Sequence, residues 1–151
     1  MKLARGLFKI LKEILRHLLR RPVVGINIIA KVPDGRIVMI RRGDTGGWAL
    51  PGGTVEWGET LRSTAERELL EEAGITKAQL GEVKGIYSAI DRDPRFHAVT
   101  VVVEALVDEP TLAPDNPAEI LEVGLFQQED LPSPLSHSNE DMLAHVHDSS
   151  P

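Results

Sequence analysis

Three glutamates, Glu68, Glu71 and Glu72, lie three and four residues apart in the stretch LRSTAERELLEEA. On a helix this spacing brings the three carboxylates onto one arc. Like charges so close together repel one another unless a cation offsets them. Because carboxylate oxygens are hard ligands, the arc predicts a site for Mg²⁺, or alternatively Mn²⁺, with water and substrate phosphate oxygens completing the coordination.

Cysteine is absent from the chain. Its absence excludes disulfides, thiolate zinc sites and cysteine nucleophiles, so any metal must be held by oxygen or histidine. Just ahead of the glutamates runs the stretch GGWALPGGTVEWGE, in which Gly52 and Gly53 permit a backbone path that lies close to a ligand. Together the two features favour a divalent metal ion bound next to a phosphate group.

The element that must position the glutamates is a helix over about residues 61–73. Thr60 is a good N-cap, Gly74 is a good residue just past the C-terminus, and no Pro or Gly interrupts the residues between them. The stripe expected to pack into the core consists of Leu61, Ala65 and Leu69. We therefore expect one face of this helix to pack and the neighbouring face to carry charge.

The stretch GTVEWGETLRSTAERELLEEAGI, residues 53–75, resembles a complete Nudix box. The family's pattern is Gly, five residues, Glu, seven residues, Arg-Glu, an aliphatic, any residue, Glu-Glu, any residue, Gly and an aliphatic. The matching positions are Gly53, Glu59, Arg67, Glu68, Leu69, Glu71, Glu72, Gly74 and Ile75. The flanking strand and helix pattern extends the resemblance to residues 22–146. It implies the family's α/β (α+β) fold, an α/β/α sandwich with a mixed sheet.

The resemblance also implies roles for the residues that match the pattern of the box. Glu68, Glu71 and Glu72, with the carbonyl of Gly53, would bind one or more divalent ions, and one glutamate would assist the attacking water. The implied reaction is hydrolysis of a diphosphate bond, in which the ion offsets phosphate charge, polarises the P–O bonds and orients water.

Two further groups of residues have roles that the resemblance suggests. Arg67 and Glu59 look like a supporting pair, in which Arg67 orients a metal-binding glutamate; the alternative is an ordinary surface ion pair. A further catalytic acid is expected on a downstream loop, where Asp115, Glu119 and Glu122 are the candidates. Glu119 is favoured because it immediately precedes a strand-like run, although a rim position without function is an equal alternative.

Substrate recognition is expected from basic residues outside the box. The stretch AIDRDPRFHAVTVVVEA resembles the corresponding segment of ADP-ribose-type and nucleoside-diphosphate-sugar members, and within it Arg92, Arg95 and His97 are candidate contacts. Arg41 and Arg42 end a predicted strand that leads into the glycine loop, so they are candidates for phosphate contact. Solvated arginines are the alternative reading.

The favoured function is Mg²⁺-dependent hydrolysis of a nucleoside diphosphate linked to another moiety, with ADP-ribose or a nucleotide sugar as first choices. A (deoxy)nucleoside triphosphate pyrophosphohydrolase of the housecleaning type and a dinucleoside polyphosphate hydrolase are alternatives. A non-catalytic nucleotide-binding module is the alternative of a different class, and the complete box disfavours it.

Alternating apolar and β-branched runs predict the strands of the fold. The predicted strands cover 23–32, 36–42, 83–90, 97–107 and 120–126, and a terminal helix is expected over 138–146. Pro33, Asp34 and Gly35 supply turn chemistry for a hairpin-like connection between the first two strands. Trp48 and Trp57 are expected to be packing residues.

The N-terminal segment, residues 1–21, differs in charge from the rest of the chain. It has seven Lys or Arg against the single Glu13, a net charge of +6, and since the whole chain carries −6 the remainder carries −12. Its leucines and isoleucines follow helical spacing, with most of the basic residues on other faces. We therefore expect a basic amphipathic helix over 1–21, a catalytic domain over 22–146 and a frayed tail over 147–151.

These features also indicate partners and location. The acidic remainder argues against nucleic-acid binding, so we expect a small-molecule nucleotide as substrate. The helix at 1–21 is expected to pack on its own domain or in a homodimer, and an anionic membrane surface or a partner helix is the alternative. Since no export signal is evident, the expected location is the cytoplasm.

Overall fold

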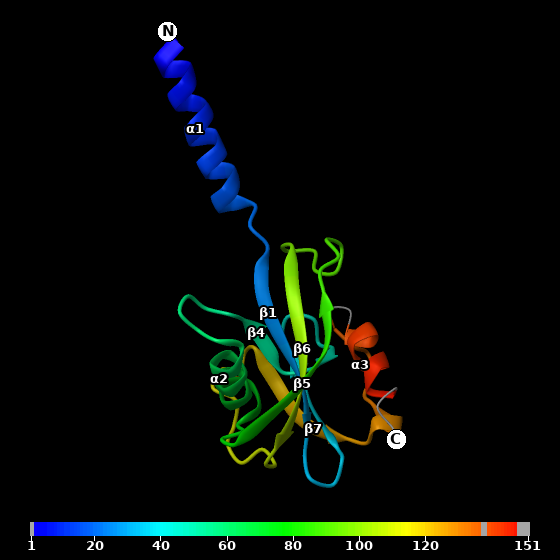
Figure 1. The fold of residues 1–151 in the computed structure, drawn as a ribbon. Coiled ribbons are helices and arrows are strands. Elements are labelled where there is room, and N and C mark those ends of the chain that lie inside the picture. The colour runs from blue at the N-terminus through cyan, green and yellow to red at the C-terminus, as the bar shows by residue number, and fades with distance from the viewer. Residues whose placement is uncertain (1, 137–138, 148–151) are drawn as a thin grey trace.

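The computed structural model describes residues 2–136 and 139–147. Three α-helices, seven strands and a short 3₁₀ helix make up this part of the chain (Figure 1). In chain order they are α1 (Lys2–Leu19), β1 (Val23–Lys31), β2 (Ile37–Arg42), β3 (Trp48–Ala49), β4 (Gly52–Thr54), α2 (Leu61–Ala73), β5 (Ala78–Tyr87), β6 (Ala98–Val107), β7 (Ile120–Phe126), η1 (Gln128–Asp130) and α3 (Asn139–His147).

Within the described residues the strands form one mixed sheet. Its central path runs β3-β2-β1-β6-β5, with β4 pairing to β1 and β7 to β2. The long central pair β1 and β6 is parallel, from Val23 opposite Ala98 to Lys31 opposite Leu106, and the other pairs are antiparallel. A parallel pair needs a long crossover, and the segment between β1 and β6 contains α2, which packs on one face of the sheet.

Helices cover both faces of this sheet. Adjacent residues of β1 and β2 point to opposite faces, so Ile28 packs beneath α2 while Ile29 packs toward α3. On the α2 side the helix contributes Ala65, Leu69 and Ala73, and on the α3 side the helix contributes Met142 and Leu143. The mixed-sheet α/β/α sandwich predicted from the sequence is confirmed.

Most predicted strands agree with the structure, and β7 has the predicted bounds. The strand predicted over 83–90 was wrong at both ends, since β5 spans Ala78–Tyr87. Pairing with β6 extends β5 backward to Ala78, opposite Val107, through residues of weak strand propensity. The strands β3 and β4 were not predicted, because they are two and three residues long and form only by pairing with β2 and β1.

The hairpin-like connection after β1 exists, but the two strands separate at once. Only Lys31, the last residue of β1, and Ile37, the first residue of β2, are register partners. Elsewhere β1 pairs with β6 and β4, and β2 pairs with β7 and β3. Gly35, with φ of 90°, provides the left-handed turn residue. The two strands therefore separate and leave the end of β1 near β4 open for a site.

The two tryptophans behave differently. Trp48 packs edge-on against Phe126, with ring centroids 4.9 Å apart, as expected of a packing residue. Trp57 is fully exposed in the loop between β4 and α2, so the prediction that it packs was wrong. The loop carries its side chain away from the apolar cores on both faces of the sheet.

The N-terminal helix α1 projects away from the sandwich (Figure 1). It ends at Leu19, three residues before Pro22, which disfavours helical conformation in the residue ahead of it. The large apolar side chains from Leu7 to Leu18 are all exposed, so the expected packing of this helix on its own domain was wrong. Among the described helices, none is long and apolar enough to cross a membrane.

Candidate active site

The helix α2 spans the predicted residues and is capped at both ends. The Thr60 side chain accepts a hydrogen bond from the Ser63 amide at 3.1 Å, and the Thr60 amide donates to the Ser63 hydroxyl at 2.8 Å. Gly74 ends the helix in the left-handed conformation, at φ of 65°, and its amide donates to the Leu70 carbonyl at 3.0 Å. These caps determine where the acidic face begins and ends.

The acidic arc of α2 is partly buried. Glu68 and Glu72 are only 8% and 7% exposed, and they lie beside the fully buried Ala65 and Leu69. The side chain of Glu71 is 44% exposed, against 11% for the side chain of Glu68. Two of the three carboxylates therefore turn inward, although isolated charged side chains are rarely buried.

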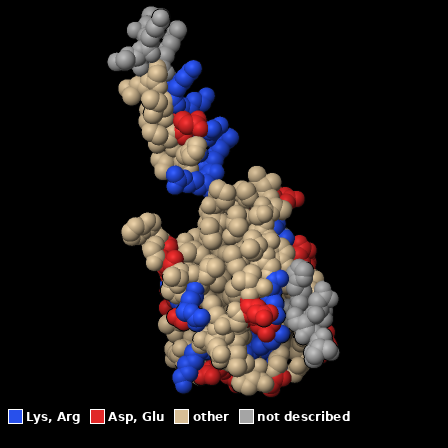
Figure 2. Space-filling model, viewed as in Figure 1, with Lys and Arg blue, Asp and Glu red and all other residues tan. Residues whose placement is uncertain are grey.

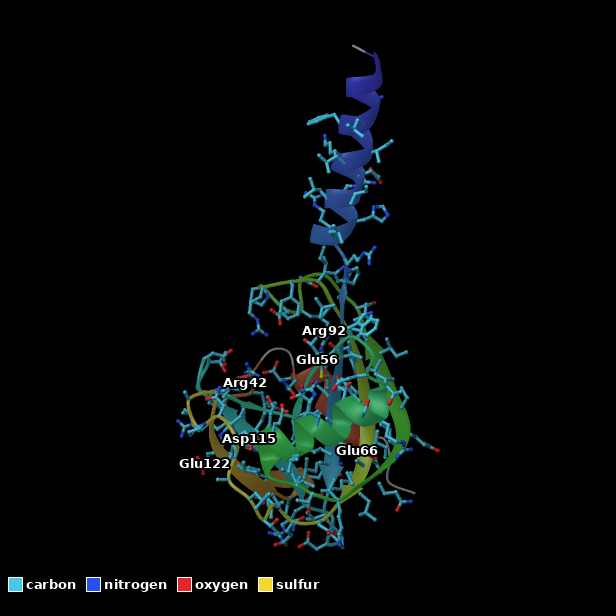
Figure 3. All side chains as sticks on the ribbon, turned by 90° about the vertical axis from the view of Figure 1, so that its left-hand side faces the viewer. Arg42, Glu56, Glu66, Arg92, Asp115 and Glu122 are labelled. Carbon is cyan, nitrogen blue, oxygen red and sulfur yellow. The ribbon has the colours of Figure 1, made fainter. Side chains whose placement is uncertain are left out.

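A cleft of about 430 Å³ opens beside these two glutamates. Residues from the strands β1, β2, β3, β4 and β6, from the helices α2 and α3 and from four loops line it. The charged ones are Glu56, Glu68, Glu72, Glu119, Asp93, Arg42, Arg92 and Arg95. Figure 3 shows Arg42, Glu56 and Arg92 along the upper side of α2, while Asp115 and Glu122 lie beyond one end of the helix. The cleft thus brings carboxylates and guanidinium groups from distant parts of the sequence together.

Glu72 is held by the glycine loop. Its carboxylate accepts a hydrogen bond from the Gly52 amide at 2.8 Å. Burial raises the pKa of Glu72 to about 8, the charge of Glu68 adds to this rise, and the Gly52 hydrogen bond opposes it. A cation in the cleft would favour the ionised form of this carboxyl group.

Glu68 lies against the backbone of Gly53. A Cβ atom at that position would overlap the Glu68 carboxylate, so the absence of a side chain lets the two groups approach. Burial raises the pKa of Glu68, and the neighbouring Arg67 guanidinium opposes this rise. The close approach places the Glu68 carboxylate and the main chain of Gly53 on the same wall of the cleft.

Arg67 is hydrogen-bonded to carboxylates on both sides. Its Nε and Nη2 donate to the two oxygens of Glu59 at 2.8 and 3.0 Å, a bidentate pair, and its Nη1 donates to Glu68 at 2.7 Å. Weaker bonds reach the Thr54 carbonyl at 3.1 Å and Glu71 at 3.3 Å. The hydrogen bond from Arg67 is the main cause that lowers the pKa of Glu59 to about 2. Arg67 therefore ties the loop before α2 to the acidic face of the helix.

The donor set suits a hard divalent cation. Glu68 and Glu72 offer buried carboxylate oxygens. The charge of Glu68 raises the pKa of Glu72, and the charges of Glu71 and Glu119 raise that of Glu68, which is the repulsion that a cation would relieve. Among the side chains that the structure describes, no group of three or more Asp, Glu or His lies at metal-holding positions. Glu71, hydrogen-bonded to Arg67, lies outside the cleft lining. In this conformation the structure brings two of the three predicted glutamate ligands together.

Of the three downstream acids, Glu119 lies at the cleft. It lines the cavity, and the Asn116 amide donates to its carboxylate at 3.4 Å. Asp115 does not line the cleft, and its backbone amide donates to the Glu71 carbonyl at 2.8 Å. Glu122 is 3.7 Å from Arg41 in an ion pair on the neighbouring strand, also outside the cleft.

The five predicted substrate contacts divide into two groups. Arg42, Arg92 and Arg95 line the cleft, whereas Arg41 and His97 do not. Successive side chains of a strand point to opposite faces, so Arg41 points away and donates to the Gly46 carbonyl at 3.3 Å. These two residues have no direct access to the cavity in this structure.

Acidic partners hold the arginines that line the cleft. Asp44 accepts two hydrogen bonds from Arg42, both at 3.0 Å, and Asp93 accepts bonds of 3.0 and 2.8 Å from Arg95. Arg92 donates to Asp141 at 2.8 Å and lies over the Tyr87 ring. Such bidentate pairs pre-orient the guanidinium planes and lower the entropy cost of binding a phosphate.

Several residues at the cleft were not predicted. Glu56 precedes α2 within the glycine-rich stretch, so an acidic residue inside the box was an available signal. Phe96 directly precedes His97 in the predicted substrate segment and could have been included. Asn27 of β1 and Asn139 of α3 had no sequence signal, because only the tertiary fold brings their elements together.

The family model of the NUDIX domain matches residues 20–146. The chain belongs to the Nudix hydrolase family. The resemblance of residues 53–75 to a Nudix box is thereby confirmed.

Named relatives match part of the chain. The ADP-ribose pyrophosphatase of Methanocaldococcus jannaschii is 41% identical over 85 residues, 54% of this chain and 48% of that protein. A putative mutator protein MutT4 of Mycobacterium tuberculosis is 35% identical over 104 residues, 67% of this chain and 41% of that protein. The match thus spans less than half the length of these two relatives.

Solved structures share the Nudix fold. A MutT NUDIX hydrolase from Burkholderia pseudomallei is 34% identical, with a TM-score of 0.69 over 84% of this chain and 99% of that one. The NUDIX domain of NrtR from Shewanella oneidensis, in a structure with ADP ribose, has a TM-score of 0.71 over 85% of this chain and 88% of that one. At 20% identity the second match supports the fold alone.

Proposed function

We propose that this Nudix protein hydrolyses a diphosphate bond in a nucleotide, using a divalent metal ion held in the cleft beside α2. The observation that carries this proposal is the pairing of two buried carboxylates, Glu68 and Glu72, with three arginines in one cavity. A hard cation held by the carboxylates on one side, and guanidinium groups on the other, would complement the negative charge of a diphosphate.

Glu68 and Glu72 would hold the ion, with the Gly53 carbonyl and a reoriented Glu71 as further ligands. The bound ion would offset phosphate charge and polarise the bond that breaks. Arg67 keeps the Glu68 carboxylate in place through its 2.7 Å hydrogen bond.

In the proposed reaction a water oxygen bonds to phosphorus as the bond from phosphorus to the bridging oxygen breaks. The proton of the water passes to a carboxylate, and one product phosphate leaves with the bridging oxygen. Glu119 is exposed at the cleft lining and is the candidate acceptor. Arg42, Arg92 and Arg95 would bind the phosphates and help to orient them.

For the substrate we favour ADP-ribose or a nucleotide sugar. Support comes from the 41% identical relative named ADP-ribose pyrophosphatase, and from the presence of Arg92 and Arg95 at the cleft. A nucleoside triphosphate is the second candidate, because the 34% identical structure is named a MutT hydrolase. The −12 charge outside residues 1–21 disfavours a polynucleotide, although an RNA pyrophosphohydrolase of Caulobacter vibrioides is 40% identical over 75 residues. A cytoplasmic location stays part of the proposal.

The test is a substrate screen with the full chain and Mg²⁺. The panel contains ADP-ribose, nucleotide sugars, nucleoside triphosphates, dinucleoside polyphosphates and a 5′-triphosphorylated RNA, with products separated by anion-exchange chromatography. AMP plus ribose 5-phosphate would support the favoured substrate, and a nucleoside monophosphate plus pyrophosphate would support the second.

Two controls make the screen decisive. Glu72→Gln should abolish turnover, whereas Glu66→Gln, an exposed position on the same helix, should not change it. Lack of Mg²⁺-dependent turnover across the whole panel, or equal turnover by wild type and Glu72→Gln, would overturn the proposal.

A further inference from the structure

The N-terminal helix α1 leaves a continuous apolar face uncovered. Seven large side chains on it are between 45% and 70% exposed, namely Leu7, Phe8, Ile10, Leu11, Ile14, Leu15 and Leu18. The helix extends away from the sandwich and shows no cover over this face (Figure 1). A contiguous exposed apolar face of this kind usually marks an interaction surface.

The opposite face of the same helix is basic. Lys9, Lys12 and Arg16 follow one another at helical spacing, and Arg20 continues the series just beyond the helix end. The one acid in the segment, Glu13, is ion-paired with Arg16 at 2.5 Å. Figure 2 shows Lys and Arg along one side of α1 and other residues along the other side.

We propose that α1 binds the surface of an anionic lipid bilayer. Its apolar face would enter the boundary between headgroups and acyl chains, and its basic residues would lie at the level of the anionic headgroups. The charge of +6 on residues 1–21 is complementary to such a surface, and each basic residue near the surface adds to the attraction. This proposal does not depend on the function proposed above.

The width of the apolar face favours a lipid surface over a single partner helix. At 3.6 residues per turn, Phe8 and Ile10 lie about 160° apart around the helix axis, with Leu11 between them. A coiled-coil partner would cover only a narrow seam of this arc, whereas a planar interface covers all of it. A second copy of α1 would also bring one segment of +6 charge against another.

Binding of α1 would place one end of the cleft near the bilayer. Val23 is the first residue of β1, four positions after Leu19, and it lines the cleft. Its amide donates to the His97 carbonyl at 2.9 Å, so the loop before β6 lies at the same end of the domain. That loop exposes Ile90 and Phe96, and Phe96 also lines the cleft. These side chains are suited to lie near the same surface.

The first experiment measures co-sedimentation of the full chain with lipid vesicles. We expect binding to phosphatidylglycerol vesicles at low salt, with at least roughly tenfold weaker binding to phosphatidylcholine vesicles. Raising the salt concentration shortens the range of the charge attraction and should weaken binding to the phosphatidylglycerol vesicles. Lack of binding to the anionic vesicles would overturn the proposal.

A pair of matched variants tests the apolar face. Leu11→Gln with Ile14→Gln removes two side chains from the centre of that face without changing the charge. Gly6→Gln with His17→Gln introduces two glutamines outside the arc from Ile10 to Phe8, and Gly6 has open space around it. We expect the first variant to bind anionic vesicles at least roughly tenfold more weakly and the second to bind within about twofold of wild type.

A second pair tests the charge. Lys9→Gln with Lys12→Gln should weaken binding to anionic vesicles by on the order of tenfold. Arg62→Gln with Lys77→Gln removes the same charge from exposed positions of the domain and should leave binding almost unchanged. Circular dichroism and thermal unfolding of each variant confirm that the domain stays folded.

Two outcomes would contradict the proposal that α1 binds an anionic bilayer, even if α1 bound another surface. Equal binding of wild type and the Leu11→Gln, Ile14→Gln variant would show that the apolar face is not involved. A dimer in sedimentation equilibrium that this variant abolishes, together with no vesicle binding, would identify a second copy of the chain as the occupant.

Discussion

The helices α1 and α2 place their side chains in opposite ways. On α2 two carboxylates are buried, and the Gly52 amide, the Arg67 guanidinium and the sheet surround them. On α1 seven large apolar side chains are exposed, and the basic residues lie opposite them. Buried charge and exposed apolar surface both cost folding free energy, so each departure from the usual pattern indicates a role outside folding.

The difference between the two helices lies in their surroundings. The helix α2 is held by its caps, by the apolar core between α2 and the sheet and by the Arg67 hydrogen bonds, so its acidic groups have one defined arrangement. The helix α1 connects to β1 through the short segment 20–22. The fixed surroundings of α2 suit a rigid site for small ions and phosphates. The projecting helix α1 suits contact with a large surface.

The first prediction concerns the buried acids of α2 and has the largest expected effect. Glu72→Gln should lower Mg²⁺-dependent turnover by on the order of 100-fold or more, because even partners of metal ligands cost 10-fold to 100-fold when lost. The measurement is kcat/KM on the best substrate of the screen. Glu66→Gln, an exposed acid of the same helix, should stay near wild type. Equal activity in the two variants would show that the buried Glu72 has no catalytic role that the exposed Glu66 lacks.

The second prediction concerns Arg67, which positions Glu68. Arg67→Lys keeps the positive charge but cannot form the bidentate pair with Glu59 together with the bond to Glu68. We expect Mg²⁺ affinity to fall by roughly 10-fold to 100-fold. Isothermal titration calorimetry measures this, with Arg62→Lys as the control on the exposed side of α2. If both variants bound Mg²⁺ equally, Arg67 would be an ordinary surface pair.

The third prediction concerns pH and the stability of the metal-free protein. The pKa of Glu72 rises from its usual value near 4.5 to about 8 on folding. The stabilisation that the protonated Glu72 gives the folded state is therefore fully present below about pH 4.5 and is lost as the pH rises toward 8. The free energy of unfolding should fall with pH in this window, by up to about 1.4 kcal/mol per unit from this group. Urea unfolding in EDTA measures the slope.

Two variants and one ligand sharpen the pH experiment. Glu72→Gln should flatten the slope, and Glu66→Gln should retain it. Mg²⁺ favours the ionised carboxylate and should reduce the loss of stability at high pH. A slope unchanged by Glu72→Gln would show that another group titrates, and no effect of Mg²⁺ would argue against the proposed ion site.

The fourth prediction concerns the leucines of the two helices, and for α1 it expects almost no effect. Leu69→Ala on α2 removes a fully buried side chain and should lower the free energy of unfolding by about 2–5 kcal/mol. Leu11→Ala on α1, where the side chain is 53% exposed, should change it by less than about 0.5 kcal/mol. Urea unfolding of the full chain compares them. A large cost for Leu11→Ala would show that α1 packs on a folded partner in solution.

Local patterns alone determined the position and polarity of both helices. Thr60 and Gly74 specify the ends of α2 because capping acts within one turn, and the box from Gly53 to Ile75 specifies the family. The strand β7 was predicted with its bounds for the same reason, since alternation is a local signal. What could be predicted depended on interactions between residues near each other in the chain.

Tertiary structure alone decided which of the predicted residues meet. Burial of Glu68 and Glu72 but not Glu71 follows from how α2 is turned on the sheet, which spacing along one helix cannot specify. Arg42 lines the cleft while Arg41 does not, because strand pairing determines which face each residue takes. The exposure of the apolar side chains of α1 was likewise decided only by the tertiary structure, because helical spacing predicts an apolar face but not whether another element covers it.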